Sequence, residues 1–452
     1  MKKIIFALIA LFVMSGRMAA QSWVPVGSPE FSAGMIVGTP DIAIDVSGTP
    51  YVVYNDFTIN PPYGAATVMK YNGSSWVTVG SPGFGGEDAE FISIAIDGSG
   101  TPYVVYADSS YGYSATVVKY NGSSWVTVGS PGFSDANAEG TSIAIDSSGT
   151  PYVVYSDEGY NATVMKYNGS NWVTVGSPMF SVGAVAYISI AIDNSGTLYV
   201  GYQDLSPSYY EKATVMKYNG STWVTVGSPG FSAGAASFTK IAIDYTGTPY
   251  MVFADNSDST KATVMKYNGS SWVTVGSAGF SAGTTMGTSI AIDGSGTPYV
   301  VYGDGATSIL LQATVMKYNG SNWVNVGGAG FSAGQAVGTT IAINGSGTPY
   351  VFYIDGIYGG ATVMKYGTTS GVNEVFGSSD IQIYPNPLST TVHIKAPEKV
   401  NVTIINVVGQ VVLKQDNATD IDMSGLANGM YIIKVYDENN VILKTVKLVK
   451  VE

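Results

Sequence analysis

The stretch ATVMKYNGSSWVTVGSPGF, residues 66–84, recurs with small changes along most of the chain and decides its fold. The tryptophan of this stretch is one of seven in the chain. They lie roughly fifty residues apart, which is the length of one four-stranded blade of a β-propeller. The seven positions are Trp23, Trp76, Trp125, Trp172, Trp223, Trp272 and Trp323. The repeat therefore predicts an array of blades.

Each repeat contains four short runs with strand character, in a fixed order. In the second repeat these runs are residues 76–80, 93–97, 102–106 and 115–120. The last two are apolar in both phases, which is typical of strands covered on both faces. Four such runs per repeat favour an all-β fold built from four-stranded sheets.

The order of the runs predicts how the array closes. The array begins with a tryptophan run at Trp23 but ends with residues 361–366, which no tryptophan follows. If the tryptophan run is the outer strand of each blade, the last blade lacks one. Residues 22–27 would supply it, closing the ring and covering a sheet edge that would otherwise invite aggregation. We therefore predict a seven-bladed β-propeller over residues 21–367.

The composition excludes several function classes. The chain has 452 residues, 45% hydrophobic and 12% charged, with 56 glycines and a net charge of −12. Nucleic-acid binding needs clustered Lys and Arg, so a nucleic-acid partner is not expected. There is no cysteine, and the only arginine and histidine are Arg17 and His393. The repeats thus lack the residues for a Ser-His-Asp triad, a histidine metal site or an arginine clamp.

The N-terminus has the features of an export signal. Lys2 and Lys3 precede an apolar run, residues 4–14, that is too short to span a bilayer. We expect residues 1–20 to be a signal peptide that directs the chain to the periplasm and is removed after Ala20. No later apolar run is long enough to predict a transmembrane span.

The tail differs from the repeats. Residues 368–379 are expected to form a linker, and short alternating runs in residues 380–452 suit a small immunoglobulin-like β-sandwich. Three motifs occur there in order: YPNP at 384–387, NVVGQV at 406–411 and LANGMYIIK at 426–434. Their most distinctive residues are Tyr384, Pro385, Asn386, Pro387, Gly409, Gly429 and Tyr431.

These motifs resemble the type A C-terminal sorting domain of the type IX secretion system. The resemblance implies a Gram-negative bacterium, export across the outer membrane by the secretion machinery, and processing by its sortase-like peptidase. It places the protein outside the cell or on the outer-membrane surface. The spacing of Tyr71 and Trp76 also resembles Kelch-type and galactose-oxidase-like propellers. Ala107-Asp108 replaces the Kelch Gly-Gly doublet, so no activity is carried over.

The loops of the repeats fall into two classes. The turns 97–102 and 120–124 barely change between repeats, whereas the loops after WVTVG and after PYVVYxD vary in length and content. Because binding residues concentrate on loops held by a rigid scaffold, we expect any site on the variable face. Exposed tyrosines there would bind sugar rings or protein partners, unless they only pack the loops. The candidates are Tyr63, Tyr111, Tyr113, Tyr160, Tyr209, Tyr210 and Tyr358.

Acidic residues form a second group of candidates. Glu87, Asp88 and Glu90 are expected close to a second acidic group in the next repeat, and together they would bind calcium or serve as glycosidase carboxylates. Solvated loop charge is the alternative. That second group is Asp135, Glu139 and Glu158. No other cofactor is predicted.

Two sets of repeated aspartates are assigned structural roles. A position that recurs in every blade usually serves the blade, and aspartate readily accepts hydrogen bonds from loop amides. One set ends the PYVVY strand: Asp56, Asp108, Asp157, Asp204, Asp255, Asp304 and Asp355. The other begins the DxSGT turn: Asp45, Asp97, Asp146, Asp193, Asp244 and Asp293, with Asn344 in the last repeat.

Three functions remain open from the sequence. The first is a secreted or cell-surface propeller that binds a glycan or a protein, an adhesin for example. The second is an extracellular carbohydrate-active enzyme that uses loop carboxylates, and the third is a structural surface component. The lack of a catalytic motif favours binding over catalysis.

Overall fold

The structure is a computed structural model. It describes residues 21–59, 61, 64–86, 88–157, 159–306, 311–356, 359–367, 381–396, 399–406, 410–436 and 442–451. The expected signal peptide at 1–20 and linker at 368–379 lie outside these ranges. The described residues divide into two compact units, Gln21–Gly367 and the residues after 380, and each unit is described by itself. None of the described helices is long and apolar enough to cross a membrane.

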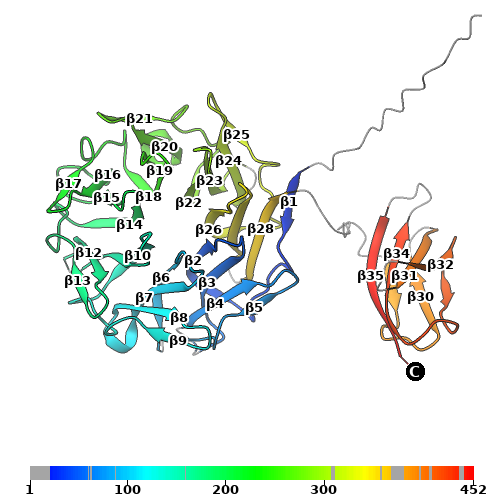
Figure 1. The fold of residues 1–452 in the computed structure, drawn as a ribbon. Coiled ribbons are helices and arrows are strands. Elements are labelled where there is room, and N and C mark those ends of the chain that lie inside the picture. The colour runs from blue at the N-terminus through cyan, green and yellow to red at the C-terminus, as the bar shows by residue number, and fades with distance from the viewer. Residues whose placement is uncertain are drawn as a thin grey trace, which may run out of the picture. The chain divides into compact units, whose positions relative to one another are not determined.

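The first unit is a ring of seven four-stranded antiparallel sheets, the blades (Figure 1). We number them in chain order from blade 1, β2 to β5. The innermost strands surround the centre of the ring and are β2 (Ile36–Ile44), β6 (Ala89–Ile96), β10 (Glu139–Ile145), β14 (Val185–Ile192), β18 (Ala236–Ile243), β22 (Thr285–Ile292) and β26 (Ala336–Ile343). These strands carry the IAID motif. The predicted seven-bladed propeller is confirmed.

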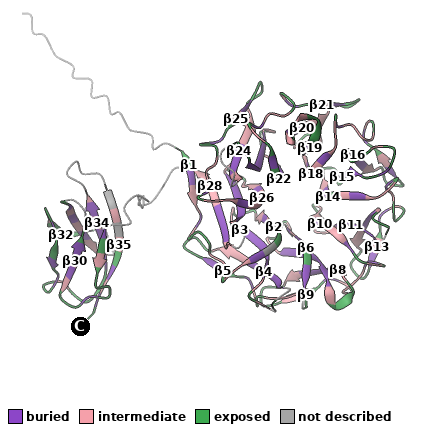
Figure 2. Ribbon diagram, turned by 180° about the vertical axis from the view of Figure 1, so that it is seen from behind, coloured by how far each residue is buried: buried purple, intermediate pink, exposed green. Residues whose placement is uncertain are grey.

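The two middle strands of each blade form its core. The second strands are β3 (Pro50–Asp56), β7 (Pro102–Asp108), β11 (Pro151–Ser156), β15 (Leu198–Asp204), β19 (Pro249–Asp255), β23 (Pro298–Asp304) and β27 (Pro349–Asp355). The third strands are β4 (Ala65–Tyr71), β8 (Ser114–Tyr120), β12 (Ala162–Tyr167), β16 (Lys212–Tyr218), β20 (Lys261–Tyr267), β24 (Gln312–Tyr318) and β28 (Ala361–Gly367). Every residue of β3, β7 and β15 is buried, as expected for strands covered on both faces. Figure 2 shows the buried residues along the blades and the exposed ones mainly in the loops.

The outer strands close the ring. They are β5 (Trp76–Thr78), β9 (Trp125–Thr127), β13 (Trp172–Thr174), β17 (Trp223–Thr225), β21 (Trp272–Thr274), β25 (Trp323–Asn325) and, for blade 7, β1 (Ser22–Pro25). β1 pairs with β28, with Trp23 opposite Tyr366, so the N-terminal strand completes the last blade as predicted (Figure 1). Two short 3-10 helices, η1 (Ser109–Tyr111) and η2 (Asn256–Asp258), follow β7 and β19.

The seven tryptophans join neighbouring blades. Each indole Nε1 donates a hydrogen bond to the carbonyl of the valine that lies three residues after the tryptophan of the preceding blade, at 2.6 to 2.7 Å. Each indole also packs against a phenylalanine of the preceding linker segment, with ring centroids 4.1 to 4.6 Å apart. Because Trp23 bonds to Val326, this series of contacts runs around the whole ring. The GSPGF segment is thus the junction between blades.

The repeated turn after each innermost strand is stabilised by its aspartate. Oδ1 of Asp97 accepts hydrogen bonds from the amides of Ser99 and Thr101, both at 2.9 Å. In blade 7, Asn344 Oδ1 accepts the corresponding amides of Ser346 and Thr348. The side-chain oxygen is therefore enough to form the turn, which supports the structural role assigned to this set.

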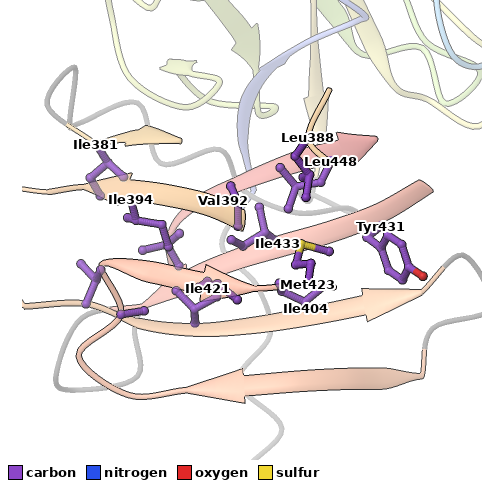
Figure 3. Close-up of a cluster of buried hydrophobic side chains, with 14 residues drawn as sticks. Ile381, Leu388, Val392, Ile394, Ile404, Ile421, Met423, Tyr431, Ile433 and Leu448 are labelled. Carbon is purple, nitrogen blue, oxygen red and sulfur yellow. The ribbon is translucent and has the colours of Figure 1, made fainter. Parts of the chain in front are cut away.

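The second unit consists of two antiparallel sheets around one core (Figure 3). The three-stranded sheet has the order β29 (Gln382–Tyr384), β30 (Thr391–Lys395), β33 (Asp420–Asp422), and the four-stranded sheet has the order β32 (Val411–Gln415), β31 (Asn401–Asn406), β34 (Gly429–Tyr436), β35 (Ile442–Lys450). Val392, Ile404, Ile421 and Ile433 are fully buried between the sheets. This is the small β-sandwich expected for the tail.

Candidate functional site

Every innermost strand of the propeller contains a β-bulge in its first half. In β6 the pairing with β7 shifts between Glu90 and Ser93, and corresponding shifts occur in the other six blades. One residue in each bulge has a positive φ between 49° and 79°. These seven bulge residues are Gly38, Phe91, Gly140, Tyr187, Phe238, Gly287 and Gly338. Four blades thus use glycine, while blades 2, 4 and 5 use an aromatic residue.

The aromatic bulge residues are held in an unfavourable backbone conformation. A left-handed conformation costs a residue with a side chain roughly 1–2 kcal/mol relative to glycine. Such residues persist only where their surroundings fix them, and they cluster at functional sites. At each aromatic bulge the following blade supplies a threonine whose hydroxyl donates to the carbonyl of the bulge residue. The pairs are Thr141 with Phe91, Thr239 with Tyr187 at 2.7 Å, and Thr288 with Phe238 at 2.6 Å.

These bulges line a cavity at the centre of the ring. Its volume is about 400 Å³, and residues of all seven innermost strands contribute to its wall. The rings of Tyr187 and Phe238 lie against each other, with centroids 5.1 Å apart, and Phe91 and Tyr187 are 38% and 44% exposed. Since the innermost strands run from the variable loops toward the uniform turns, the bulges lie in the half of the channel nearer the variable face. The cavity therefore lies toward the variable face, where any site is expected.

The wall of the cavity is asymmetric. Blades 6, 7 and 1 have glycine at the bulge, and other residues that line the cavity there include Thr288, Thr339 and Pro40. At Gly338 no side chain fits, because a Cβ would lie 2.5 Å from Cδ of Pro40. At Gly287 the nearest atom would be 3.6 Å away. A flat ligand would thus meet aromatic rings on one side and small residues on the other, with room beside Gly287 but not beside Gly338.

The predicted acidic cluster lies partly at this cavity. Asp88 is buried, and Glu139 lines the cavity in the blade next to Glu90. Burial raises the pKa of Glu90, and the charges of Asp88 and Glu139 raise it further. Glu87 and Glu158 lie outside the described residues, and Asp135 is exposed. No group of three or more acidic or histidine side chains that could hold a metal ion occurs within the described ranges.

The loop tyrosines divide into exposed and anchored residues. Tyr111, Tyr160 and Tyr210 are 50%, 51% and 76% exposed on blades 2, 3 and 4. The hydroxyl of Tyr113 donates to Asp88 Oδ2 at 3.2 Å, and Tyr209 packs against Gly230. Tyr63 and Tyr358 lie outside the described residues. Met179, Val182 and Leu205 are further exposed apolar side chains in the variable loops.

The aspartates at the ends of the second strands serve their own blades. Asp108 Oδ1 accepts the amide of Ser110 at 3.0 Å and caps η1, and Asp204 Oδ1 accepts the amide of Ser206 at 3.0 Å. Both aspartates are buried. These contacts support the structural role assigned to the set from the sequence.

Phe91, Tyr187 and Phe238 are not among the candidates predicted from the sequence. They lie within strands, whereas the predicted candidates lie in loops. An available signal was their position: each stands three residues before the IAI run, where blades 3, 6 and 7 have glycine. Comparing the repeats column by column would have exposed this difference.

The motifs of the tail have defined contacts in the second unit. The side chain of Asn386 joins β35 through both of its polar atoms: Nδ2 donates to the Lys447 carbonyl at 2.6 Å and Oδ1 accepts the Val449 amide at 3.0 Å. Tyr431 is buried, and its hydroxyl donates to the Ala427 carbonyl at 2.7 Å. Gly429 has a φ of 148° where β34 begins. Pro385 and Pro387 flank Asn386, and Gly409 lies outside the described residues.

Comparison with solved structures supports the fold of the propeller. A fungal alcohol oxidase of the AA5 family, in complex with copper, is 12% identical with a TM-score of 0.50 and covers 96% of this chain and 100% of its own. An ulvan lyase of polysaccharide lyase family PL25 is 12% identical with a TM-score of 0.50 and covers 75% of this chain and 96% of its own. At these identities the likeness concerns the fold alone. No curated protein matches the sequence.

The tail gives the more specific match. Residues 382–450 match the family model described as the secretion system C-terminal sorting domain. The matched segment spans β29 to β35 and includes Asn386 and Tyr431. Residues 382–450 are thus a type IX sorting domain, and the chain is a protein exported to the cell surface or the extracellular space.

Proposed function

We propose that the propeller is a carbohydrate-binding domain whose site is the central cavity. The observation that carries this proposal is the aromatic bulge: three blades keep a strained Phe or Tyr at a position where the other four have glycine. Since glycine forms the same bulge without strain, the fold does not require these rings. Residues retained against backbone strain are expected to serve a site.

The size of the cavity favours a small ligand over a protein. A cavity of about 400 Å³ lies within the range of roughly 300–1,000 Å³ that is typical of small-molecule sites. A stable protein partner would need about 800 Å² of surface on each side, far more than the cavity offers. The loop tyrosines Tyr111, Tyr160 and Tyr210 would then extend the contact along a longer glycan.

The chemistry of the wall suits a sugar ring. Sugars combine a face of C–H groups with a rim of hydroxyls, and aromatic rings offer a flat apolar surface for the former. A carboxylate such as that of Glu139 accepts hydrogen bonds from the latter. Phe238 and Tyr187 supply the aromatic side of such a site, and Glu139 of blade 3 supplies an acceptor.

A glycan array with the chain from Gln21 onward tests this proposal. We expect a defined set of glycans to bind, and Phe238→Gly and Tyr187→Gly to weaken that binding at least about tenfold, because stacking surface is lost while the bulge keeps its shape. Tyr245→Gly is the matched control, since Tyr245 is an exposed aromatic residue in a uniform turn. Equal binding by all three variants, or no binding to any glycan of the array, would contradict the proposal.

A carbohydrate-active enzyme is the second candidate, supported by the raised pKa of Glu90. A carboxyl group whose pKa is raised by burial and neighbouring acids is suited to act as a general acid. We expect such an enzyme to release reducing ends from the glycans that bind, and Glu90→Gln to abolish the release without abolishing binding. If the chain neither binds a glycan nor releases reducing ends, the third candidate remains, a structural surface component.

A further inference from the structure

We propose that the cavity selects a glycan carrying a single anionic group, a carboxylate or a sulfate ester, and that Lys240 binds this group. The inference rests on the proposed carbohydrate-binding function and specifies its ligand. It starts from a second ring of equivalent positions, the residues directly before each IAI run. These are Asp41, Ser93, Ser142, Ser189, Lys240, Ser289 and Thr340.

Most residues of this ring link neighbouring blades. The hydroxyl oxygen of Ser189 accepts the amide of Ile241 in the next blade at 3.1 Å, and Ser289 accepts that of Ile341 at 3.4 Å. In blade 1, Asp41 Oδ2 accepts the amide of Ile94 at 3.1 Å. A lysine ammonium has no acceptor, so Lys240 cannot make this link. Blade 5 therefore lacks this hydrogen bond to the next blade.

Lys240 has no partner of its own within the described part of the chain. Its side chain is exposed and lines the cavity, and it forms no ion pair or hydrogen bond with any described residue. Asp41 is the other charged residue of this ring, three blades away by the shorter path. The Asp41 carboxylate is already engaged by the Ser93 hydroxyl at 3.0 Å and by two backbone amides. The Lys240 ammonium is thus available to a ligand.

The position of Lys240 relates it to the aromatic wall. It follows Phe238 by two residues on β18, and Phe238 lies against Tyr187. A sugar stacked on these two rings would place a ring substituent near the ammonium. A charge-assisted hydrogen bond between an ammonium and a carboxylate or sulfate is stronger than a neutral one.

The other charges of the cavity limit the ligand to few anionic groups. Asp41 and Glu139 line the cavity and are acidic, and the whole chain carries a net charge of −12. Like charges held close together are unfavourable, so a densely charged polyanion would be repelled. An otherwise neutral glycan with one acidic residue fits, with its anionic group at blade 5 and its hydroxyls toward Glu139 of blade 3.

Calorimetric titration with three probes tests this inference. The probes are an oligosaccharide with one hexuronic acid, the same oligosaccharide after reduction of its carboxyl group, and the reduced form carrying one sulfate ester. For the unmodified chain we expect both anionic probes to bind roughly tenfold more tightly than the neutral one, with a preference that weakens as salt is added. If only one anionic probe is preferred, that result identifies the group.

Variants of Lys240 separate this inference from the proposed function. Lys240→Ser introduces the residue found at this position in four other blades, so the fold is expected to be kept, and the anionic preference should disappear while neutral binding remains. Lys240→Arg should keep the preference. Phe238→Gly should weaken all three probes alike. A preference that survives in Lys240→Ser, or none in the unmodified chain, would overturn the role of Lys240 alone, whereas no binding of any probe would overturn the carbohydrate site as well.

Discussion

This propeller contains two concentric rings of seven equivalent positions, and the two rings differ in how strictly their residues are repeated. In the outer ring every blade has a tryptophan, and every tryptophan makes the same hydrogen bond and the same aromatic contact with the preceding blade. In the inner ring four blades have glycine and three have an aromatic residue, although all seven strands have a bulge at this point. Both rings thus repeat a backbone feature in every blade, but the side chains are repeated only in the outer one.

The difference separates residues that serve the fold from residues that serve a site. Each blade meets the same kind of neighbour, so a position needed for packing requires the same residue seven times. A position whose residue differs between blades is therefore not fixed by the packing of one blade on the next. The inner-ring aromatics are confined to blades 2, 4 and 5, and Lys240 lies in blade 5. The exposed loop tyrosines occupy blades 2, 3 and 4. Any ligand is therefore expected on this half of the ring.

The largest effect is expected from the outer ring. Trp223→Ala removes a buried indole that stacks on Phe180 at 4.2 Å with 12° between the planes, and leaves the Val175 carbonyl without its donor. We expect a loss of about 3–5 kcal/mol in the free energy of unfolding, measured by chemical denaturation. Trp125→Ala should cost less, because Trp125 is only half-buried and its ring is tilted by 33° against that of Phe84 rather than stacked on it.

The two tryptophan variants are compared by their losses in the free energy of unfolding. If both losses are equal, stacking geometry and burial do not determine how much a tryptophan contributes to stability. The outer ring would then be uniform in energy as well as in sequence.

The inner ring should tolerate side chains only where space allows. Gly338→Ala would bring a Cβ within 2.5 Å of Pro40 in addition to the cost of a positive φ, and we expect a loss of about 2–4 kcal/mol. Gly38→Ala bears only the backbone cost of about 1–2 kcal/mol, because no atom lies within 4 Å of the added Cβ. Thermal unfolding of both variants measures the difference. A greater loss at Gly38 would contradict this description of the cavity wall.

Most of the fold could be predicted from the sequence, because the repeats specify it seven times. Counting the runs gave the number of blades and showed that residues 22–27 had to complete the last one. The repeated tryptophans and turn aspartates were assigned to packing and turns for the same reason, and their contacts agree. The tail was identified from motifs whose residues, such as Asn386, make specific contacts.

The candidate site could not be predicted in the same way. A bulge shifts the pairing by one residue, and hydrophobic alternation does not reveal where this happens. Phe91 therefore looked like one more apolar residue of a strand. The hydrogen bond between Tyr113 and Asp88 depends on the paths of two loops, which no local pattern encodes.

Two equivalent threonines can show whether a position of the inner ring serves the fold alone or also serves the site. Thr239→Val removes the 2.7 Å hydrogen bond to the Tyr187 carbonyl, and Thr339→Val removes the equivalent 2.6 Å bond to the Gly287 carbonyl. We expect each to cost about 1 kcal/mol in the free energy of unfolding. Only Thr239→Val should also weaken glycan binding, because the hydrogen bond that it removes holds Tyr187, an aromatic bulge residue.

Calorimetric titration of the bound glycan, together with denaturation of both variants, measures these effects. Weakened binding in Thr339→Val as well would mean that the bulge backbone, rather than the aromatic ring, positions the ligand. Unchanged binding in both would leave Tyr187 without a role in the site.

The smallest effect concerns the uniform turns and their response to acid. Burial alone would raise the pKa of Asp97, but hydrogen bonds from Ser99 and Thr101 outweigh it and lower the pKa, and the pKa values of Asp146, Asp193 and Asp293 are lowered in the same way. Because the pKa is lower in the folded than in the unfolded state, each carboxylate stabilises the fold above its unfolded pKa, about 3.9, and this contribution is lost as the pH falls through the folded value.

Replacing these four aspartates by asparagine, the residue that forms the same turn at position 344, should therefore reduce the loss of stability below about pH 4 while changing stability little at pH 7. Glu90 and Asp355, whose pKa values are raised in the folded state, act in the opposite direction and are the same in both proteins, so the comparison isolates the turns. Thermal unfolding of the two proteins between pH 2.5 and pH 7 would measure the effect. Parallel curves over this range would show that the turn carboxylates contribute nothing beyond what an amide oxygen provides.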